Sequence, residues 1–199
     1  MKFTTGLFAS IVLGLSIAAW MPGPRAEDAA KPDAADQPPE PEFKPRGQGM
    51  PRDIKYSAWH KLCFKSSDGK VICRTSLSGT WQTGQTAVRI YLIERAGGKS
   101  RMQIFLPVGL YLQAGVKLTV DEHKPVHFPY SWCLTNMCIA ANVTSPELIH
   151  AMETGKKLTL EVVDNNLLTV ASSLPLDHFA SVRKGEPEKT YDFDQIDKD

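Results

Sequence analysis

Two close pairs of cysteines constrain this chain more than any other feature of its sequence. Cys63 is followed by Cys73, and Cys133 by Cys138, behind an N-terminus that is typical of secreted proteins. Exported domains oxidise their thiols, so an even number of cysteines in close pairs predicts disulfides. Loop entropy gives each short loop roughly 2–3 kcal/mol of stabilisation. We therefore expect a domain with two small disulfide loops and no reactive thiol.

The N-terminus reads as a signal peptide over residues 1–26. Lys2 supplies a positive charge, and an apolar run from Phe3 to Trp20 follows it. The run is short and contains glycines and hydroxyls, which favours a cleaved signal over a membrane-spanning helix. Cleavage is expected after Ala26, with a cut near Ala18 or Ala19 as the alternative. The mature chain is expected to be periplasmic or secreted.

The remaining chain divides by composition into three parts. Residues 27–52 are rich in Pro, Ala and acidic side chains and predict a disordered tether. Residues 53–184 form one domain of ordinary size. Residues 185–199 are expected to be an acidic, disordered tail. The domain carries 15 Lys and Arg against 10 Asp and Glu, so a basic domain lies between two acidic ends.

The first cysteine pair predicts a specific hairpin. Strand-like runs at 56–64 and 71–77 flank the loop Ser67-Asp68-Gly69. A three-residue loop with Gly69 at positive φ places Cys63 directly opposite Cys73. A two-residue Asp68-Gly69 loop would instead pair Phe64 with Cys73. The cysteine spacing favours the bulged three-residue turn.

Further strand-like runs follow at short spacing. They alternate apolar and polar residues or are separated by Gly, Asn and Pro, at 87–95, 101–106, 110–112, 116–120, 158–163 and 167–172. Such spacing predicts an all-β domain, an antiparallel β-sandwich or a barrel-like sheet.

One short helix is expected at about 144–154. Ser145 can cap it with Pro146 in the first turn, or Thr144 can cap it with Glu147 three residues later. Gly155 is expected to end the helix in a left-handed conformation.

The sequence offers no convincing catalytic, cofactor or metal site. Cys133 and Cys138 lack the Cys-x-x-Cys spacing that lowers a thiol pKa. His60, His123 and His127 lie near cysteines in sequence but lack the paired spacing of a zinc site. Asp121 and Glu122 would point to opposite faces of a strand, and no Gly-x-Ser-x-Gly motif is present. We therefore predict that the chain is not an enzyme and needs no cofactor.

The basic domain predicts a partner class in outline. Its charge favours an acidic envelope or host surface, such as lipopolysaccharide, anionic lipid or an acidic protein, with peripheral membrane contact. The other interpretation is ordinary solvated charge that complements the acidic tail. Nothing resembles a nucleic-acid-binding module. The sequence leaves the oligomeric state open.

Several segments of the domain together resemble a known family. Trp59 lies four residues before Cys63, and the run 106–112 (LPVGLYL) leads to 115–121 (GVKLTVD). With the close pair Cys133 and Cys138, these segments resemble the invasion-associated locus B family. Two departures mark a divergent member. Residues 175–182 lack the family's Ser, Gly and final Ala, and Met137 stands where Gly often precedes the cysteine.

The resemblance implies a periplasmic or secreted β-sandwich without a known catalytic site, which in some pathogens contributes to host-cell invasion. Our first hypothesis is therefore a non-enzymatic envelope or secreted domain that binds a protein or surface and contributes to host interaction. The alternatives are an envelope structural or assembly factor, docked through its tether and tail, and an unrecognised enzyme or thiol oxidoreductase.

Overall fold

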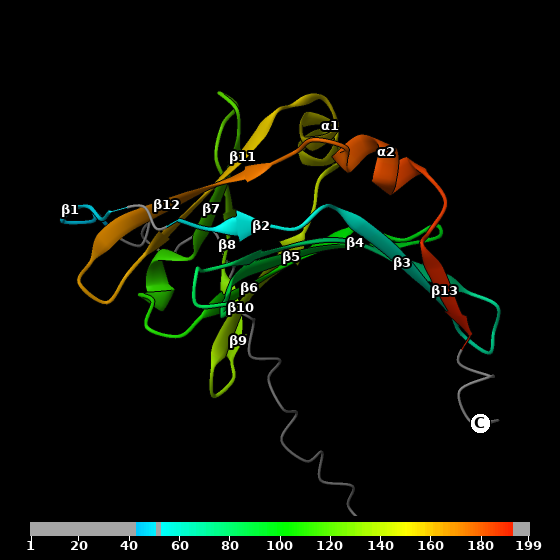
Figure 1. The fold of residues 1–199 in the computed structure, drawn as a ribbon, viewed down its shortest axis with the longest axis horizontal. Coiled ribbons are helices and arrows are strands. Elements are labelled where there is room, and N and C mark those ends of the chain that lie inside the picture. The colour runs from blue at the N-terminus through cyan, green and yellow to red at the C-terminus, as the bar shows by residue number, and fades with distance from the viewer. Residues whose placement is uncertain (1–42, 51–52, 193–199) are drawn as a thin grey trace, which may run out of the picture. The chain divides into compact units, whose positions relative to one another are not determined.

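A computed structural model describes residues 43–50 and 53–192, which form two β-sheets and two short helices (Figure 1). The expected signal peptide, most of the tether and residues 193–199 lie outside the described residues. Within the described ranges, no helix is long and apolar enough to cross a bilayer.

The larger sheet has eight strands and holds both disulfides. Along it the order is β13-β3-β4-β5-β6-β10-β9, and the short β2 also pairs with β4. Every pairing is antiparallel except that of β13 with β3. The strands are β2 (Lys55–Tyr56), β3 (His60–Lys65), β4 (Val71–Thr80), β5 (Thr86–Arg95), β6 (Arg101–Pro107), β9 (Tyr130–Cys133), β10 (Met137–Val143) and β13 (Lys189–Asp192).

The smaller sheet has five strands in the order β1-β12-β11-β7-β8. A 3-10 helix at Leu112–Ala114 leads into β7, and β11 and β12 form the expected last hairpin. The strands are β1 (Gly47–Gln48), β7 (Val116–Val120), β8 (Val126–Phe128), β11 (Lys157–Val163) and β12 (Leu168–Pro175).

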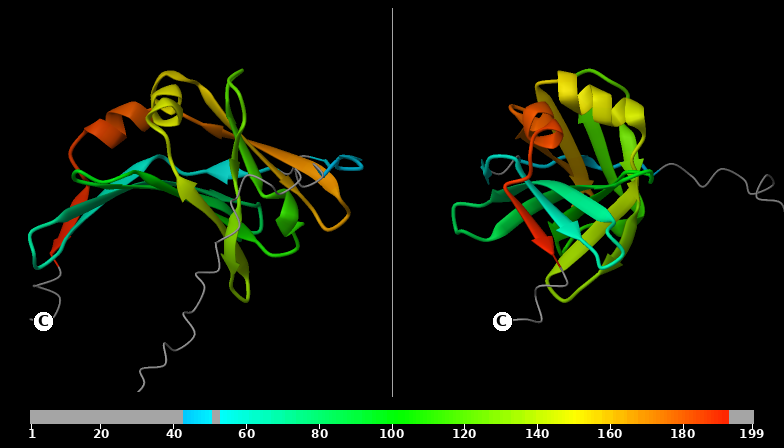
Figure 2. Two further views of the ribbon diagram at one scale, coloured as in Figure 1. Left: turned by 180° about the vertical axis from the view of Figure 1, so that it is seen from behind. Right: turned by 90° about the vertical axis from the view of Figure 1, so that its right-hand side faces the viewer.

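The two sheets pack face to face, which confirms the all-β sandwich (Figure 2). Because side chains alternate along a strand, every second residue of each sheet turns toward the other sheet and is buried. The helices α1 (Pro146–Thr154) and α2 (Phe179–Lys184) lie together over one end of the layers. The largest fully buried side chains are Phe128, Phe179, Leu77, Ile90, Leu92, Met102, Ile104, Leu118, Met152, Leu158, Leu160 and Leu174.

The first hairpin has the register that the cysteines predict. Cys63 is the direct cross-strand partner of Cys73, and the turn between β3 and β4 has Gly69 at φ +77°. The Gly69 N–H donates to the Ser66 carbonyl, and the Ser66 N–H donates to the Lys70 carbonyl. The bulged turn is therefore confirmed, and it requires glycine at that position.

Helix α1 begins as expected but ends differently. The Leu148 N–H donates to the Ser145 hydroxyl at 3.2 Å, so Ser145 is the cap. The left-handed end at Gly155 is wrong, because Gly155 has φ −80°. A Cβ there would lie 2.5 Å from Val120 Cγ1 and 2.8 Å from Asp121 Oδ2. Glycine is needed for the close approach of α1 to β7, not for its backbone freedom.

The expectation of a single helix is also wrong. Helix α2 has six residues and no side-chain cap, and the residue before it, His178, has φ +64°. These are not the signals that mark a helix in sequence. The helix is held instead by packing, because Phe179 is fully buried and its ring lies 4.8 Å from that of Trp59.

Both ends of the domain carry strands where disorder was expected. In the tether, Gly47 and Gln48 pair in parallel with Leu168 and Thr169 of β12. In the tail, β13 pairs in parallel with β3. Polar composition predicts disorder, but the edge strand of a sheet offers unpaired N–H and C=O groups that order even a polar segment. These two segments therefore belong to the folded domain.

Candidate functional site

The outer face of the eight-stranded sheet, which points away from the five-stranded sheet, carries basic but no acidic side chains at its strand positions, although Glu188, just before β13, pairs with the outward His60. Alternation along β4, β5, β6 and β13 directs five basic side chains to this face: Arg74, Arg89, Arg95, Arg101 and Lys189. Among the described strands, no Asp or Glu occupies an outward position of this sheet. We call these five residues the outer cationic face.

The cations of this face have no acidic partner within the described ranges. Arg89 donates from Nε to the Ser78 hydroxyl at 3.2 Å and from Nη1 to the Tyr91 hydroxyl at 3.4 Å. Arg74 Nε is buried, and no described group accepts a hydrogen bond from it. The guanidinium charge on this face is therefore not neutralised by the described parts of the chain.

Aromatic rings lie between these cations. The ring of Tyr191 stacks on Phe64, with centroids 5.4 Å apart. The Arg74 guanidinium lies 5.7 Å from the Phe64 centroid and 4.3 Å from the Tyr91 centroid. Tyr91 packs against Phe105 at 4.9 Å. We call the four rings and Arg74 the aromatic track, which crosses β13, β3, β4, β5 and β6 without a break.

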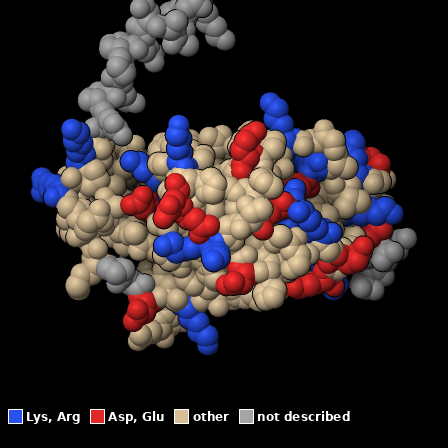
Figure 3. Space-filling model, turned by 90° about the horizontal axis from the view of Figure 1, so that it is seen from above, with Lys and Arg blue, Asp and Glu red and all other residues tan. Residues whose placement is uncertain are grey.

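The outer face is curved. In Figure 1 the sheet bends so that β13 and β9, its two edges, both turn away from β11 and β12, which makes the outer face concave. The opposite side of the domain differs in charge, because basic and acidic side chains are intermixed there (Figure 3). Lys117, for example, lies directly across from Glu161. The excess of positive charge expected from the sequence therefore faces outward from the larger sheet.

Both cysteine pairs lie at disulfide distance, as their spacing predicts. The Cα–Cα distances are 4.0 Å for Cys63 and Cys73 and 3.9 Å for Cys133 and Cys138. Cys63 and Cys138 are each 3% exposed. No cysteine is free, and all four lie in the described ranges. The pairs close the β3–β4 and β9–β10 hairpins and point to an oxidising compartment.

The histidines considered as metal ligands each contact another group. His60 Nδ1 is 2.7 Å from Glu188 Oε1, His123 Nδ1 is 3.0 Å from the Val120 carbonyl, and His127 Nε2 is 3.1 Å from the Ala114 carbonyl. In the described ranges, no three His, Cys, Asp or Glu side chains lie close enough to share a metal ion.

Asp121 of the adjacent carboxylate pair has a structural role. Its carboxylate accepts hydrogen bonds from the backbone N–H groups of Lys156 and Lys157, both at 3.0 Å. These bonds hold the end of α1 against β7.

A cluster of ion pairs fastens α2 to the sandwich. Arg183 donates to Glu94 and to Glu153 at 2.6 Å each, and Lys184 lies 2.9 Å from Glu153. Burial by itself would raise the pKa of Glu153, but the hydrogen bonds and charges of Lys184 and Arg183 lower it below its usual value. We interpret this cluster as structural, because its charges satisfy one another.

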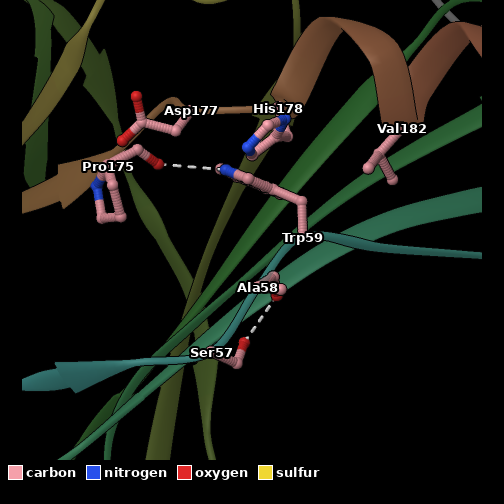
Figure 4. A pocket seen from close by; sticks show the side chains of 7 residues that line it. All are labelled: Ser57, Ala58, Trp59, Pro175, Asp177, His178 and Val182. Atoms are coloured by element: carbon pink, nitrogen blue, oxygen red, sulfur yellow. Dashed lines mark hydrogen bonds between the residues drawn. The ribbon is translucent and has the colours of Figure 1, made fainter.

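A pocket of about 350 Å³ beside α2 brings Ser57, Asp177 and His178 together with Trp59 (Figure 4). The Ser57 hydroxyl donates to the Ala58 carbonyl, as the dashed line in Figure 4 marks, and accepts from the Ser78 N–H. The Trp59 indole N–H donates to the Pro175 carbonyl at 3.0 Å. The described contacts of Ser57 are therefore those of a structural hydroxyl and not of a nucleophile.

A second cavity, of about 190 Å³, opens between the sheets. Its lining is mostly apolar, and it includes the run 106–110 and the polar turn 164–166. The run that carries the family resemblance therefore lines the gap between the two sheets.

The comparisons with known proteins agree with this fold. The family model for the invasion associated locus B (IalB) protein matches residues 59–187, from Trp59 just before β3 to Pro187 just before β13. The chain belongs to the invasion associated locus B family. The match covers both helices, both disulfides and most of the two sheets.

Two curated relatives carry the name invasion protein B homologue. They come from Brucella abortus, strain 2308 and biovar 1 strain 9-941, and each is 26% identical over 105 residues. The alignment covers 53% of this chain and 61% of each relative, so the chain spans less than two thirds of their length. These relatives are named as invasion proteins and not as enzymes.

A solved structure supports the fold. The crystal structure of invasion associated protein B from Bartonella henselae superposes with a TM-score of 0.57 at 21% identity, over 65% of this chain and 90% of that one. At this identity the likeness shows the fold alone. The departure of this chain from the family at residues 175–182 falls on α2 and on His178, which has positive φ at the position where the family usually has glycine.

Sequence analysis did not identify the aromatic track. The signal was present in β5, where Arg89 and Tyr91 alternate with the buried Val88 and Ile90. The partners of Tyr91 on the neighbouring strands can be identified only from the register of five strands. One of these strands, β13, lies in the segment expected to be a disordered tail.

Proposed function

We propose that this member of the invasion associated locus B family is a non-enzymatic binding domain of the bacterial envelope or of the secreted fraction. It contacts an acidic envelope or host surface through the outer cationic face and in this way contributes to host-cell interaction. Export through the N-terminal signal and oxidation of both cysteine pairs would precede binding.

The observation that supports this proposal is the one-sided charge of the larger sheet. Five cations share a concave face that has no outward acidic residue among its described strands. A fold needs no such segregation, because ordinary surfaces mix both signs, as the opposite side of this domain does. A surface of one sign attracts partners of the other sign and accelerates their association.

Binding to membrane fractions tests the proposal. The purified oxidised protein is sedimented with outer-membrane and host-cell membrane fractions at about 50 mM and about 500 mM salt, which span weak and strong screening. We expect binding at low salt that is lost at high salt.

Two triple variants separate the face from the net charge. Arg95→Ser/Arg101→Ser/Lys189→Ser removes exposed cations from the outer face. Lys117→Ser/Lys124→Ser/Lys157→Ser removes the same charge from exposed positions elsewhere. The first should lower the bound fraction several-fold, and the second should leave it nearly unchanged. Equal losses would show attraction by net charge alone and would contradict the proposal.

A further inference from the structure

The outer face of the larger sheet combines charge with a row of aromatic rings, and the two together indicate a particular class of ligand. We propose that the aromatic track binds an anionic polysaccharide, with sugar rings packed along the exposed parts of the aromatic side chains and the acidic substituents contacting the flanking arginines. This inference rests on the proposed function, because it names the partner of the same face.

The aromatic track is continuous. The contacts run from Tyr191 to Phe64, Arg74, Tyr91 and Phe105, each next to its neighbour at 4.3 to 5.7 Å. Five adjacent strands are separated by four spacings of about 4.8 Å, so the track is about 19 Å long. A linear chain molecule fits such a row better than a compact small molecule does.

The rings of the track are partly exposed. All four are half-buried, so part of each ring meets solvent although Phe64 and Tyr191 stack on each other and Arg74 lies over the rings of Phe64 and Tyr91. Cross-strand aromatic pairs stabilise a sheet by about 0.2–1 kcal/mol each, which explains rings on a solvated face. This stabilisation does not explain the charge around the rings. The outward strand positions of the described sheet carry Arg and Lys but no Asp or Glu.

The guanidinium groups of Arg74 and Arg89 are held in place without an acidic partner among the described residues. Arg74 is stacked between two rings, and its Nε has no described hydrogen-bond partner. Arg89 holds its side chain against Tyr91 and Ser78 through neutral hydroxyls alone. Guanidinium groups fixed in this way are preorganised for carboxylate, sulfate or phosphate oxygens, which they bind with paired N–H donors.

The chemistry of the face distinguishes a polysaccharide from other anions. A sugar ring offers C–H groups that pack on an aromatic face, and an acidic sugar adds an anion at each repeat. A polyphosphate would use the cations and leave the rings without a role. A lipid bilayer would need apolar side chains that protrude, as Trp132 and Leu134 do at the β9 edge, whereas the rings of the track lie half-buried along the sheet. Single-stranded nucleic acid would also stack, but the disulfides indicate an extracytoplasmic protein.

Four soluble probes test the ligand class. We would measure binding of the purified oxidised protein to heparin fragments, inorganic polyphosphate of matched charge, neutral dextran and oligo(dT). The prediction is tightest binding to heparin, weaker binding to polyphosphate and oligo(dT), and little binding to dextran.

Variants that keep every charge isolate the contribution of the rings. Phe105→Leu and Tyr191→Leu shorten the track at its two ends, and Tyr111→Leu changes an aromatic residue that contacts Phe43 away from the track. Each track variant should weaken heparin binding about tenfold, comparable to the loss of one stacking ring, and leave polyphosphate binding unchanged. Tyr111→Leu should change neither. Thermal unfolding of each variant checks that the domain remains folded.

The outcomes separate the two proposals. If polyphosphate binds as tightly as heparin, or if the track variants bind heparin as the parent does, the polysaccharide inference is wrong and the charge-based function stands. Tighter, ring-dependent binding of oligo(dT) would also overturn it. Both proposals are wrong if no anionic probe binds in a salt-sensitive way. They are also wrong if Arg95→Ser/Arg101→Ser does not weaken such binding.

Discussion

The two faces of the eight-stranded sheet differ in composition, although their residues alternate along the same strands. The inner face of β5 and β6 is aliphatic and fully buried, with Ile90, Leu92 and Ile104 each 0% exposed. Charges that reach the inner side at the strand ends are paired, as Glu94 is with Arg183. On the outer face, arginines lie beside half-buried rings and have no acidic partner among the described residues.

This difference separates what folding requires from what it does not. Burial of the inner face supplies the stability of the sandwich, and any charge left there must be neutralised because desolvation is costly. The outer face buries a few apolar side chains, such as Ile139 and Ala141 of β10, but its charged positions contribute little apolar burial and can vary without loss of the fold. Segregated charge and aligned rings on the outer face are therefore the better evidence for function.

Adjacent residues of β5 give the sharpest test of this difference. Leu92 faces the core and Ile93 faces outward, and their side chains have the same volume. Leu92→Ala should lower the free energy of unfolding by about 2–5 kcal/mol, because it leaves a cavity. Ile93→Ala should cost less than about 1 kcal/mol. Urea unfolding of both variants measures the gap, and equal losses would show that the outer face also supports the fold.

The disulfides extend the comparison from the centre of the sheet to its edge. Loop entropy predicts a loss of about 3 kcal/mol for Cys63→Ser/Cys73→Ser and about 2 kcal/mol for Cys133→Ser/Cys138→Ser, because the first loop is longer. In the first hairpin, β3 pairs with β13 and also contacts α2, whereas the second hairpin ends in the edge strand β9. Calorimetry of the two double variants should reproduce this order, and the reverse order would place more of the stability at the β9 edge.

The paired charges of the inner side should respond to pH. The pKa of Glu153 is lower in the folded state than in the unfolded state. Ionised Glu153 therefore stabilises the fold above its ordinary pKa of about 4.5, and this stabilisation is lost as the pH falls through the folded-state pKa. Glu153→Gln should cost about 1–2 kcal/mol at pH 7 and progressively less below about pH 4.5. Unfolding midpoints between about pH 7 and pH 3 check this. A constant difference would mean that packing, not charge, holds α2.

Local signals explain the part of the fold that the sequence predicts. The bulged turn at Gly69, the Ser145 cap and the β11–β12 hairpin each depend on residues within a few positions of one another. The strands β1 and β13 were not predictable in this way. Their partners lie more than a hundred residues away in sequence, and only the register of the folded sheet brings Tyr191 onto Phe64.

The candidate site was predictable only as a net charge. The domain's excess of Lys and Arg indicated an acidic partner, but its location depends on which residues alternate outward and on how five strands align. The strands β9 and β10 were also missed, because 122–143 mixes turns with short apolar runs. Their disulfide was expected from spacing alone, whereas β10 gains its order from pairing with β6 along its whole length.

The smallest predicted effect is also the one that depends most directly on the difference between the faces. Cations on the outer face repel one another because no outward acidic residue of the described sheet offsets them. Arg95→Ser/Arg101→Ser should therefore raise the free energy of unfolding slightly, by less than about 0.5 kcal/mol. On the other sheet, Lys117 faces Glu161 across the strands, so Lys117→Ser should lower stability by a few tenths of a kcal/mol. Chemical unfolding at low salt measures whether each variant is more or less stable than the parent. Added salt should reduce both stability changes, because it screens repulsion and attraction alike. A loss of stability in the arginine variant that salt does not change would mean that these side chains pack as part of the fold, and the outer face could then no longer be regarded as free for binding.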